Sequence, residues 1–242
     1  MVHGAPDWGI TSGKKTTYQI TDLGEFAVRL GSIVNYDRLG DVIFLDDFEA
    51  SILKWDSFGF GTGASVALST ESAKNGAQAL KITTGDAAGN LSWTWKYLPL
   101  PVPGKIGAEI SFALGSDIQY IELQLQVYTG ATQHRAAVRY RPQDDTLQYY
   151  SQSQSLETFA TEVDLYENDL TYHTLKLVVD LENAEYVRCR LNEATYDLTD
   201  VGYYTADSTD TPHFELLILV RNNSAGNHYV YVDNVILTQN EP

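Results

Sequence analysis

Residues 41–55, DVIFLDDFEASILKW, are the part of the sequence most informative about its fold. Four consecutive apolar residues at 42–45 suit a strand, and an acidic cluster separates them from an aromatic residue, Trp55. Near the other end of the chain, residues 228–238, HYVYVDNVILT, form a second apolar segment that a single acid, Asp233, interrupts. We expect these two segments to pair as the first and last strands of one domain.

The sequence between these two segments is predominantly of β type. Short runs with alternating apolar and polar residues are separated by Gly, Asn and Asp, which favour turns. No helical stretches lie between these runs, so the pattern predicts an all-β fold, an antiparallel two-sheet, jelly-roll-like β-sandwich. The expected strands are 65–69, 77–83, 91–97, 106–114, 118–128, 133–141, 146–151, 157–165, 173–181, 186–192, 214–220 and 229–238.

The two terminal segments also resemble a known family. DDFEASILKW resembles the opening strand of jelly-roll carbohydrate-binding modules, where Phe-Glu is followed by a short loop and Trp, and YVYVDNVILT resembles their closing strand. The resemblance, shared with laminin-G-like sandwiches, extends over residues 41–242 in pattern and over these two motifs in detail. It implies a structural calcium ion between the terminal strands, held by Asp47, Glu49 and Asp233. The alternative is that these acids are solvated at a sheet edge, where charge prevents aggregation.

Composition excludes some classes of partner. The chain has 32 acidic and 16 basic residues and a formal net charge of -16, which would repel a nucleic-acid backbone. No apolar run approaches the roughly 20 residues that span a bilayer, and the first residues lack the apolar region of a secretory signal. Cys189, the single cysteine, shares a face with Val187 and Leu191, so we expect a buried thiol.

Residues 1–40 differ in composition from the rest of the chain. They carry four basic and four acidic residues, so residues 41–242 account for the whole net charge. A capping box at Asp22 and Glu25 and a glycine at position 31 predict one short α-helix. Its apolar face and a tryptophan near the N-terminus would need a partner surface. We therefore predict an N-terminal arm, separate from a sandwich domain at 41–242, that assembles subunits or partners through Trp8, Leu23, Phe26 and Leu30. The alternative is that this helix caps one open end of its own sandwich.

The alternation within some strands predicts which face is buried. In residues 91–97 the aromatic residues Trp93, Trp95 and Tyr97 alternate with small or polar ones, which predicts that the tryptophans face the core. On this interpretation Trp95→Ala is a core truncation and sugar binding does not involve these two residues. In residues 118–128 the polar positions Glu122, Gln124 and Gln126 are expected to line the open face of a sheet.

Sandwiches of this outline include glucan hydrolases and polysaccharide lyases, so the sequence could carry catalytic motifs. Retaining hydrolysis needs two carboxylates about 5 to 5.5 Å apart, and the Glu-x-Asp-x-x-Glu strand of such hydrolases is absent from the sequence. The acidic clusters at 46–49 and 144–145 are placed on a terminal strand and in a turn. Residue types suited to a lyase are present in Tyr120, Gln124, His134 and Arg139. The five histidines and single cysteine lack zinc-ligand spacing. We expect that the protein is not an enzyme.

Three functions remain open on this basis. The first, which we favour, is a non-enzymatic structural or interaction protein, as in virion or surface assembly components of the decoration, head-fibre or tail type. Bacteriophage virion proteins resemble this combination of jelly roll and N-terminal arm, which implies a virion or extracellular location without a cleaved signal, or otherwise a cytoplasmic one. The second is a soluble glycan-binding module, and the third is a sandwich-fold hydrolase or lyase.

Overall fold

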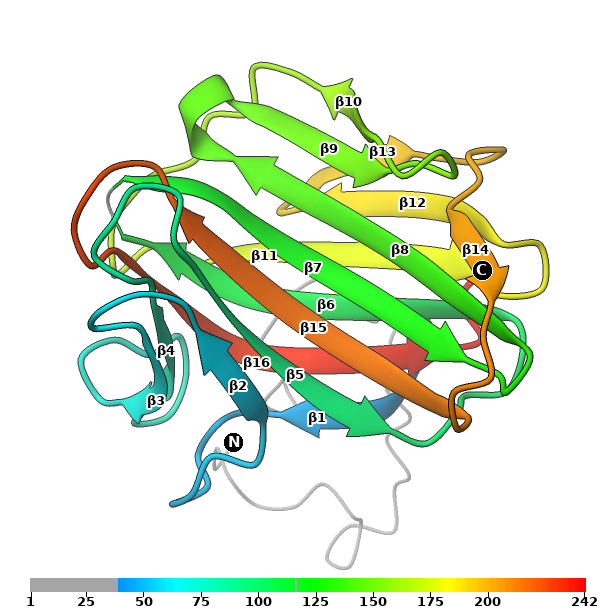
Figure 1. The fold of residues 1–242 in the computed structure, drawn as a ribbon, viewed down its shortest axis with the longest axis horizontal. Coiled ribbons are helices and arrows are strands. Elements are labelled where there is room, and N and C mark those ends of the chain that lie inside the picture. The colour runs from blue at the N-terminus through cyan, green and yellow to red at the C-terminus, as the bar shows by residue number, and fades with distance from the viewer. Residues whose placement is uncertain (1–38, 116) are drawn as a thin grey trace, which may run out of the picture. The chain divides into compact units, whose positions relative to one another are not determined.

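The computed structural model describes residues 39–115 and 117–242, and these form two stacked antiparallel sheets (Figure 1). The predicted all-β sandwich is confirmed. The strands are β1 Asp41–Asp46, β2 Asp56–Gly59, β3 Ser65–Ser69, β4 Ala79–Thr83, β5 Leu91–Leu98, β6 Lys105–Leu114, β7 Ile118–Tyr128, β8 Thr132–Arg141, β9 Thr146–Tyr150, β10 Leu156–Ala160, β11 His173–Asp180, β12 Glu185–Leu191, β13 Ala194–Asp197, β14 Tyr204–Asp207, β15 His213–Asn222 and β16 Tyr229–Gln239.

Each sheet contains eight strands. The first, which we call sheet A, has the order β13-β12-β11-β6-β16-β4-β3, and β1 also pairs with β16. The second, sheet B, has the order β10-β9-β8-β7-β15-β5-β2, and β14 also pairs with β8. Sheet B faces the viewer in Figure 1, with β15 between β7 and β5, and sheet A lies behind it.

The expected pairing of the terminal strands is present in sheet A. β1 runs antiparallel to β16, from Asp41 opposite Gln239 to Asp46 opposite Val235. β4 pairs with the first half of the same edge of β16, at Tyr229–Val232. The edge passes from β4 to β1 at Asp233 and Asn234, where Asn234 has a φ of 54° and the register with β6 shifts. The closing strand therefore bends where its edge changes partner.

One hydrophobic core fills the space between the sheets. The core contains Trp55, which is 5% exposed and packs against Phe48 with ring centroids 5.9 Å apart. The indole Nε1 of Trp55 donates a hydrogen bond to Asp46 Oδ2 at 2.9 Å, which fixes the position of the indole relative to the end of β1. Cys189 is buried as predicted, and burial raises the pKa of its thiol, so it stays protonated.

The face prediction for β5 is wrong. Ser92 and Thr94 are fully buried on the inner side, whereas Trp93 and Trp95 are half-buried and share the outer side with Tyr97, which is 53% exposed. The reason is a close approach of the two sheets: the Ser92 hydroxyl donates to the Thr83 carbonyl of β4 at 2.7 Å. A small hydroxyl residue fits in this narrow space and a tryptophan does not, so the aromatic residues take the outer face.

Some predictions lie outside the described residues. These include the helix expected within residues 22–31, and Trp8, Leu23, Phe26 and Leu30 as assembly residues. Residues 39–242 form one compact unit, and the division of the chain at residue 41 remains a prediction. Within the described ranges the only helical element is a 3-10 turn at Pro142–Asp144, and no helix there is long and apolar enough to cross a membrane.

Candidate functional site

The outer face of sheet B carries the largest set of side chains suited to ligand recognition. Strand register places the residues of neighbouring strands in rows across this face. One row runs through Phe58, Trp93, Leu219, Glu122 and Arg139, from β2 to β8. The first three residues of the row are therefore apolar and the last two are charged, and we call these two parts the apolar half and the polar half of the face.

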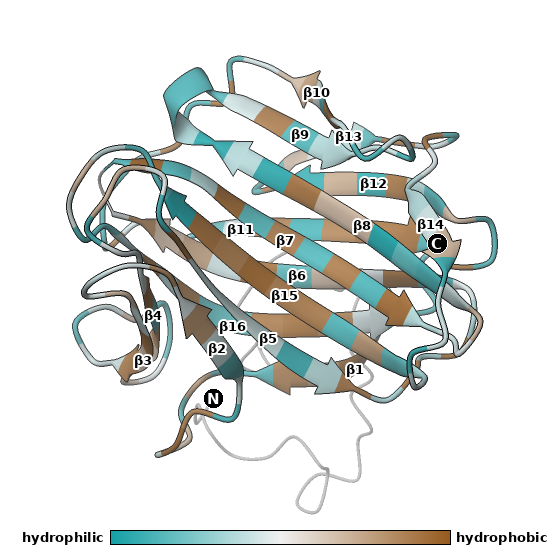
Figure 2. Ribbon diagram, viewed as in Figure 1, coloured by the Kyte–Doolittle hydropathy of each residue, from teal (hydrophilic) through white to brown (hydrophobic). Residues whose placement is uncertain are grey.

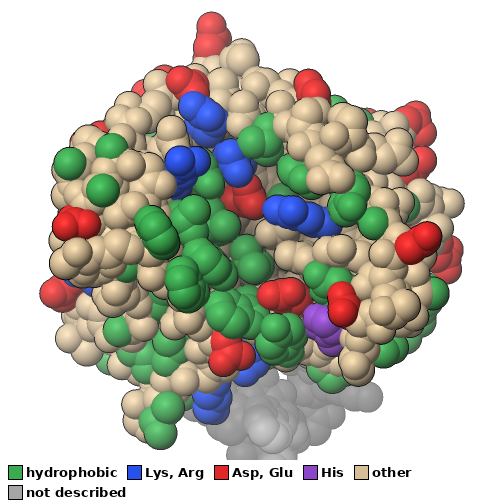
Figure 3. Space-filling model, in the orientation of Figure 1, with side chains coloured by type: hydrophobic (Ala, Val, Ile, Leu, Met, Phe, Trp, Pro, Cys, Tyr) green, Lys and Arg blue, Asp and Glu red, His purple; other side chains and the backbone are tan. Residues whose placement is uncertain are grey.

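The apolar half is continuous across three strands. The rings of Phe58 and Trp93 lie 4.6 Å apart, and Phe58 is 49% exposed. Leu217 and Leu219 of β15 lie directly opposite Trp95 and Trp93. Figure 2 shows the cause on β15, where hydrophobic colour runs unbroken along the centre of the strand because both of its faces are apolar. In Figure 3 hydrophobic side chains gather at the centre of the same face.

The polar half is built on β7 and β8. Arg139 donates to Glu122 Oε2 from Nε at 2.9 Å and from Nη2 at 2.6 Å, and both side chains are largely buried. The guanidinium of Arg139 also lies 3.7 Å from the ring centroid of Tyr120. The side chain of Arg135 stacks on Tyr150, with 4.5 Å between the guanidinium carbon and the ring centroid. The aromatic contacts hold both guanidinium groups in fixed positions on the face.

An aromatic and amide cluster borders this half. The Tyr128 hydroxyl donates to Gln126 Oε1 at 2.7 Å, and Gln133 Nε2 donates to the same oxygen at 3.1 Å. His213 stacks on Tyr128 with centroids 4.5 Å apart. Glu215 lies on β15 opposite Gln126, and desolvation raises the pKa of its carboxyl above the ordinary value.

Several buried polar atoms on this face have no hydrogen-bond partner among the described residues. They are Trp95 Nε1, Arg141 Nε, Thr146 Oγ1 and Gln148 Oε1. Register places the residues of β8 and β9 on the same side as Arg139, because Gln148 is opposite Arg139 and Thr146 is opposite Arg141. Unpaired polar atoms are rare in protein interiors, but these four are enclosed by protein and an equal number lies elsewhere in the described residues, so they do not by themselves mark a ligand site.

The four residue types suggestive of a lyase are only partly brought together. Tyr120, Gln124 and Arg139 share the outer face of sheet B. His134 pairs with the core residue Val127 and points to the other side, with its Nδ1 3.4 Å from the Tyr203 hydroxyl. Burial lowers the pKa of His134, which favours the neutral ring. A lyase quartet on one face is therefore not formed.

The predicted metal ligands converge on one segment. Glu49 Oε1 accepts from the backbone N–H groups of Ala77 and Gln78, at 2.8 and 3.0 Å. Asp233 Oδ2 accepts from those of Lys74 and Asn75, at 2.9 and 3.0 Å. The loop after β1 and the closing strand β16 thus hold the same stretch, residues 74–78, through these carboxylates.

The third predicted ligand is placed differently. Asp47 is exposed and accepts the N–H of Glu49 at 3.1 Å. Among the described residues no three His, Cys, Asp or Glu side chains form a group suited to a metal ion. Asp233 Oδ1, however, is buried without a hydrogen-bond partner there, and burial raises the pKa of this carboxyl. One unsatisfied carboxylate oxygen beside a loop backbone fits a hard cation whose other ligands would be carbonyl oxygens.

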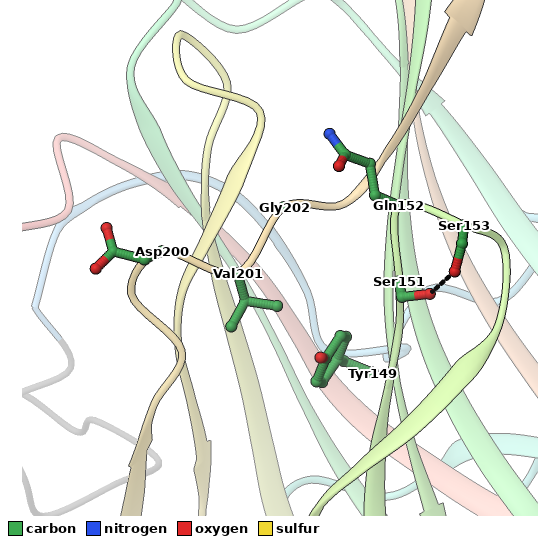
Figure 4. Close-up of a pocket in the computed structure, with 7 residues that line it drawn as sticks. All are labelled: Tyr149, Ser151, Gln152, Ser153, Asp200, Val201 and Gly202. Atoms are coloured by element: carbon green, nitrogen blue, oxygen red, sulfur yellow. Dashed lines mark hydrogen bonds between the residues drawn. The ribbon is translucent and has the colours of Figure 1, made fainter.

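A depression lies between the turn after β9 and the segment before β14 (Figure 4). It is open, has a volume of about 550 Å³ and is lined by Tyr149, Ser151, Gln152, Ser153, Asp200, Val201 and Gly202. The Ser151 and Ser153 hydroxyls lie 3.0 Å apart and hydrogen-bond to one another. It carries one charged side chain and one aromatic ring, so the outer face of sheet B is the stronger candidate site.

Most residues of this face were not identified from the sequence. The polar positions Glu122, Gln124 and Gln126 were expected on an open face; they lie on the outer side of sheet B, but Glu122 and Gln124 are buried there, at 3% and 2% exposed. The contributions of Phe58 and Arg135 depend on cross-strand neighbours that a single strand does not reveal. One available signal was the run FELLILV in β15, whose apolar residues on both faces indicate an apolar outer patch.

Comparison with known proteins gives structural but no sequence relatives. No protein-family model and no curated protein matches the sequence. A solved structure titled "Cellulose induced protein, Cip1" is similar with a TM-score of 0.56 and 13% identity, covering 81% of this chain and 96% of that one. A structure described as a "conserved carbohydrate esterase" from the Shiga toxin-encoding bacteriophage phi24B is similar with a TM-score of 0.55 and 13% identity. The match covers 82% of this chain and 98% of that one.

A third similar structure is the potassium-bound form of the Emp46p carbohydrate recognition domain. Its TM-score is 0.51 and its identity 11%, covering 76% of this chain and 88% of that one. Similarities at such low identity concern the fold alone. The chain thus has the jelly-roll β-sandwich fold found in carbohydrate-binding and lectin-like domains.

Proposed function

We propose that the protein binds carbohydrate on the outer face of sheet B. The observation that carries this proposal is the position of Trp93 and Trp95 outside the core, in rows that continue into Glu122, Gln124 and Arg139. Aromatic rings offer flat apolar surfaces to the C–H faces of sugars. Planar carboxylate, amide and guanidinium groups form paired hydrogen bonds with neighbouring hydroxyls.

We propose further that binding occurs without catalysis. The alternate positions 122, 124 and 126 of β7 hold one carboxylate and two amides, and Arg139 engages that carboxylate through two nitrogens. Most glycoside hydrolases use two carboxylates that flank the scissile glycosidic bond. The arrangement supports recognition better than acid–base chemistry.

Two further proposals come from the sequence. A calcium ion held through Glu49 and Asp233 would stabilise the junction of β1, β4 and β16, and the unsatisfied Asp233 Oδ1 supports it. Assembly through residues 1–40, in a virion or another surface structure, remains a proposal whose residues lie outside those described.

The carbohydrate proposal is tested by affinity electrophoresis in gels containing neutral and acidic polysaccharides. Trp93→Ala should lower the affinity at least about tenfold, equivalent to about 1.4 kcal/mol. Tyr166→Ala is the matched control, because Tyr166 is 78% exposed and lies outside the strands. Unretarded migration of the unmodified protein in every gel would refute the proposal.

A further inference from the structure

Arginine is concentrated on the outer face of sheet B. Residues 39–242 contain six arginines, at 135, 139, 141, 188, 190 and 221. Arg135, Arg139 and Arg141 occupy alternate positions of β8 on this face, and Arg221 lies on it near the end of β15. Basic side chains gather along one side of the face in Figure 3, next to the hydrophobic centre. This grouping is notable in a chain with a net charge of -16.

Two of these arginines are neutralised by carboxylates. Arg139 is paired with Glu122, and Arg141 Nη2 lies 2.6 Å from Asp144 Oδ2. The other two are held by uncharged groups. Arg135 stacks on Tyr150 and lies against the Gln124 amide. Arg221 Nε donates to the Gly89 carbonyl at 2.8 Å.

Neither Arg135 nor Arg221 is paired with a carboxylate in the part of the chain that the structure describes. Each of the two side chains is half-buried, so its charge is partly desolvated. Its electrostatic attraction to an anion is therefore stronger than that of a fully solvated arginine. A guanidinium fork matches a carboxylate group in geometry, through two parallel N–H···O bonds.

The two arginines flank the rest of the candidate site. Arg221 lies opposite Tyr120, whose ring contacts Arg139. In the row of Arg221, the neighbour on the other side is Leu91 of β5, two positions before Trp93. Arg135 lies opposite Gln126 on the far side of Gln124. Arg221 and Arg135 therefore stand at opposite ends of the polar half. A chain of sugar rings lying on Trp93 and Trp95 would have one guanidinium group near each of these ends.

We infer that the saccharide bound by this face carries carboxylate groups, as in a uronate polysaccharide, and that Arg135 and Arg221 bind them. The inference rests on the proposed carbohydrate binding and specifies its ligand class. A neutral sugar would leave both charges unmatched. An anionic one must approach a strongly acidic protein, and the arginines supply a local field of the opposite sign where it docks.

The test compares each of three uronate polysaccharides, polygalacturonate, alginate and hyaluronan, with its carboxyl-reduced form. Reduction converts the carboxylate to a hydroxymethyl group and leaves the sugar backbone intact. Affinity electrophoresis should show at least about a tenfold loss of affinity on reduction for the polysaccharide that binds. Arg135→Gln and Arg221→Gln should each reproduce much of this loss for the native polysaccharide and weaken binding of the reduced form much less. Salt should weaken the native interaction more than the reduced one.

Controls separate this inference from the proposal on which it rests. Lys105→Gln removes one positive charge at the start of β6, in the other sheet, and should leave every affinity unchanged. Arg135→Lys keeps the charge without the fork and should recover part of the affinity. Thermal unfolding of each variant checks that the fold is intact.

The outcomes are distinct. If the protein binds neutral glucans or reduced polysaccharides as tightly as uronates, the inference is overturned and carbohydrate binding stands. Preference for dextran sulfate over dextran, without binding to any uronate, also overturns it. If no polysaccharide binds, both the inference and the proposed function fail.

Discussion

At the scale of single residues, the Tyr186 hydroxyl connects the two sheets through the core. It is carried by β12 of sheet A, accepts the N–H of Ala137 at 2.9 Å and donates to the Tyr150 carbonyl at 2.8 Å, both in sheet B. Burial raises the pKa of Tyr186, so the group remains a donor over the whole physiological range. The backbone of β8 and β9 thus depends on a side chain from the opposite sheet.

Tyr186→Phe should lower the free energy of unfolding by about 1–3 kcal/mol, because it leaves buried backbone groups unpaired. The measurement is urea unfolding of the variant and the unmodified protein. Tyr166→Phe, at a 78% exposed position, should change nothing measurable. Equal stability of Tyr186→Phe and the unmodified protein would show that these hydrogen bonds do not hold the sheets together.

Glu215 gives a dependence of stability on pH. Desolvation raises its pKa above the ordinary 4.5, so the folded protein holds this proton to a higher pH than the unfolded chain does. Its contribution is therefore fully present below pH 4.5 and is lost as the pH rises through the raised folded value. The stability of the unmodified protein relative to Glu215→Gln should fall with rising pH across this window, measured by urea unfolding at several pH values. A difference that stays constant or rises would contradict the assignment.

At the scale of elements, β5 shows what a strand pattern predicts and what it does not. The alternation correctly separated two faces, Trp93 and Trp95 on one and Ser92 and Thr94 on the other. It did not show which face is inside, because that depends on how closely β4 approaches β5. Ser92 bonds to Thr83 and Thr94 to Asp56, so the interior at this position selects small hydroxyl side chains over large aromatic ones.

The terminal strands illustrate the opposite case. Pairing of β1 with β16 was predictable, because both segments are apolar and lie at the two ends of the β-type sequence. The outer face of sheet B was not predictable from the sequence. It is assembled from five strands, β2, β5, β15, β7 and β8, whose order along the sheet differs from their order along the chain.

The junction of β1, β4 and β16 should respond to calcium. At a free calcium concentration 100 times the dissociation constant of the site, calcium binding would add about 2.7 kcal/mol to the free energy of unfolding. Thermal unfolding in EDTA and then with added calcium should show a higher midpoint with calcium, and Asp233→Ala should remove the increase. A midpoint that calcium leaves unchanged would mean that the carboxylates of Glu49 and Asp233 serve only the backbone of residues 74–78.

At the scale of the whole molecule, residues 39–242 contain two complete sheets and one core. Deleting residues 1–38 should therefore leave a folded protein with a cooperative thermal transition. If the N-terminal segment is an assembly element, the truncated protein should also have a lower native mass than the full chain, measured by light scattering. Aggregation or loss of the transition would instead support the alternative that this segment caps its own sandwich.

At the same scale, the outer face of sheet B is the proposed saccharide-binding surface. The sequence contains four tryptophans, and two of them, Trp93 and Trp95, lie on this face, whereas Trp55 is in the core. Their indole N–H signals in a proton–nitrogen correlation spectrum, assigned with Trp93→Phe and Trp95→Phe, report on the face directly. On saturation with an oligosaccharide of the polysaccharide that binds, the signals of Trp93 and Trp95 should shift and that of Trp55 should not. Binding that leaves both of these signals in place would contradict the account.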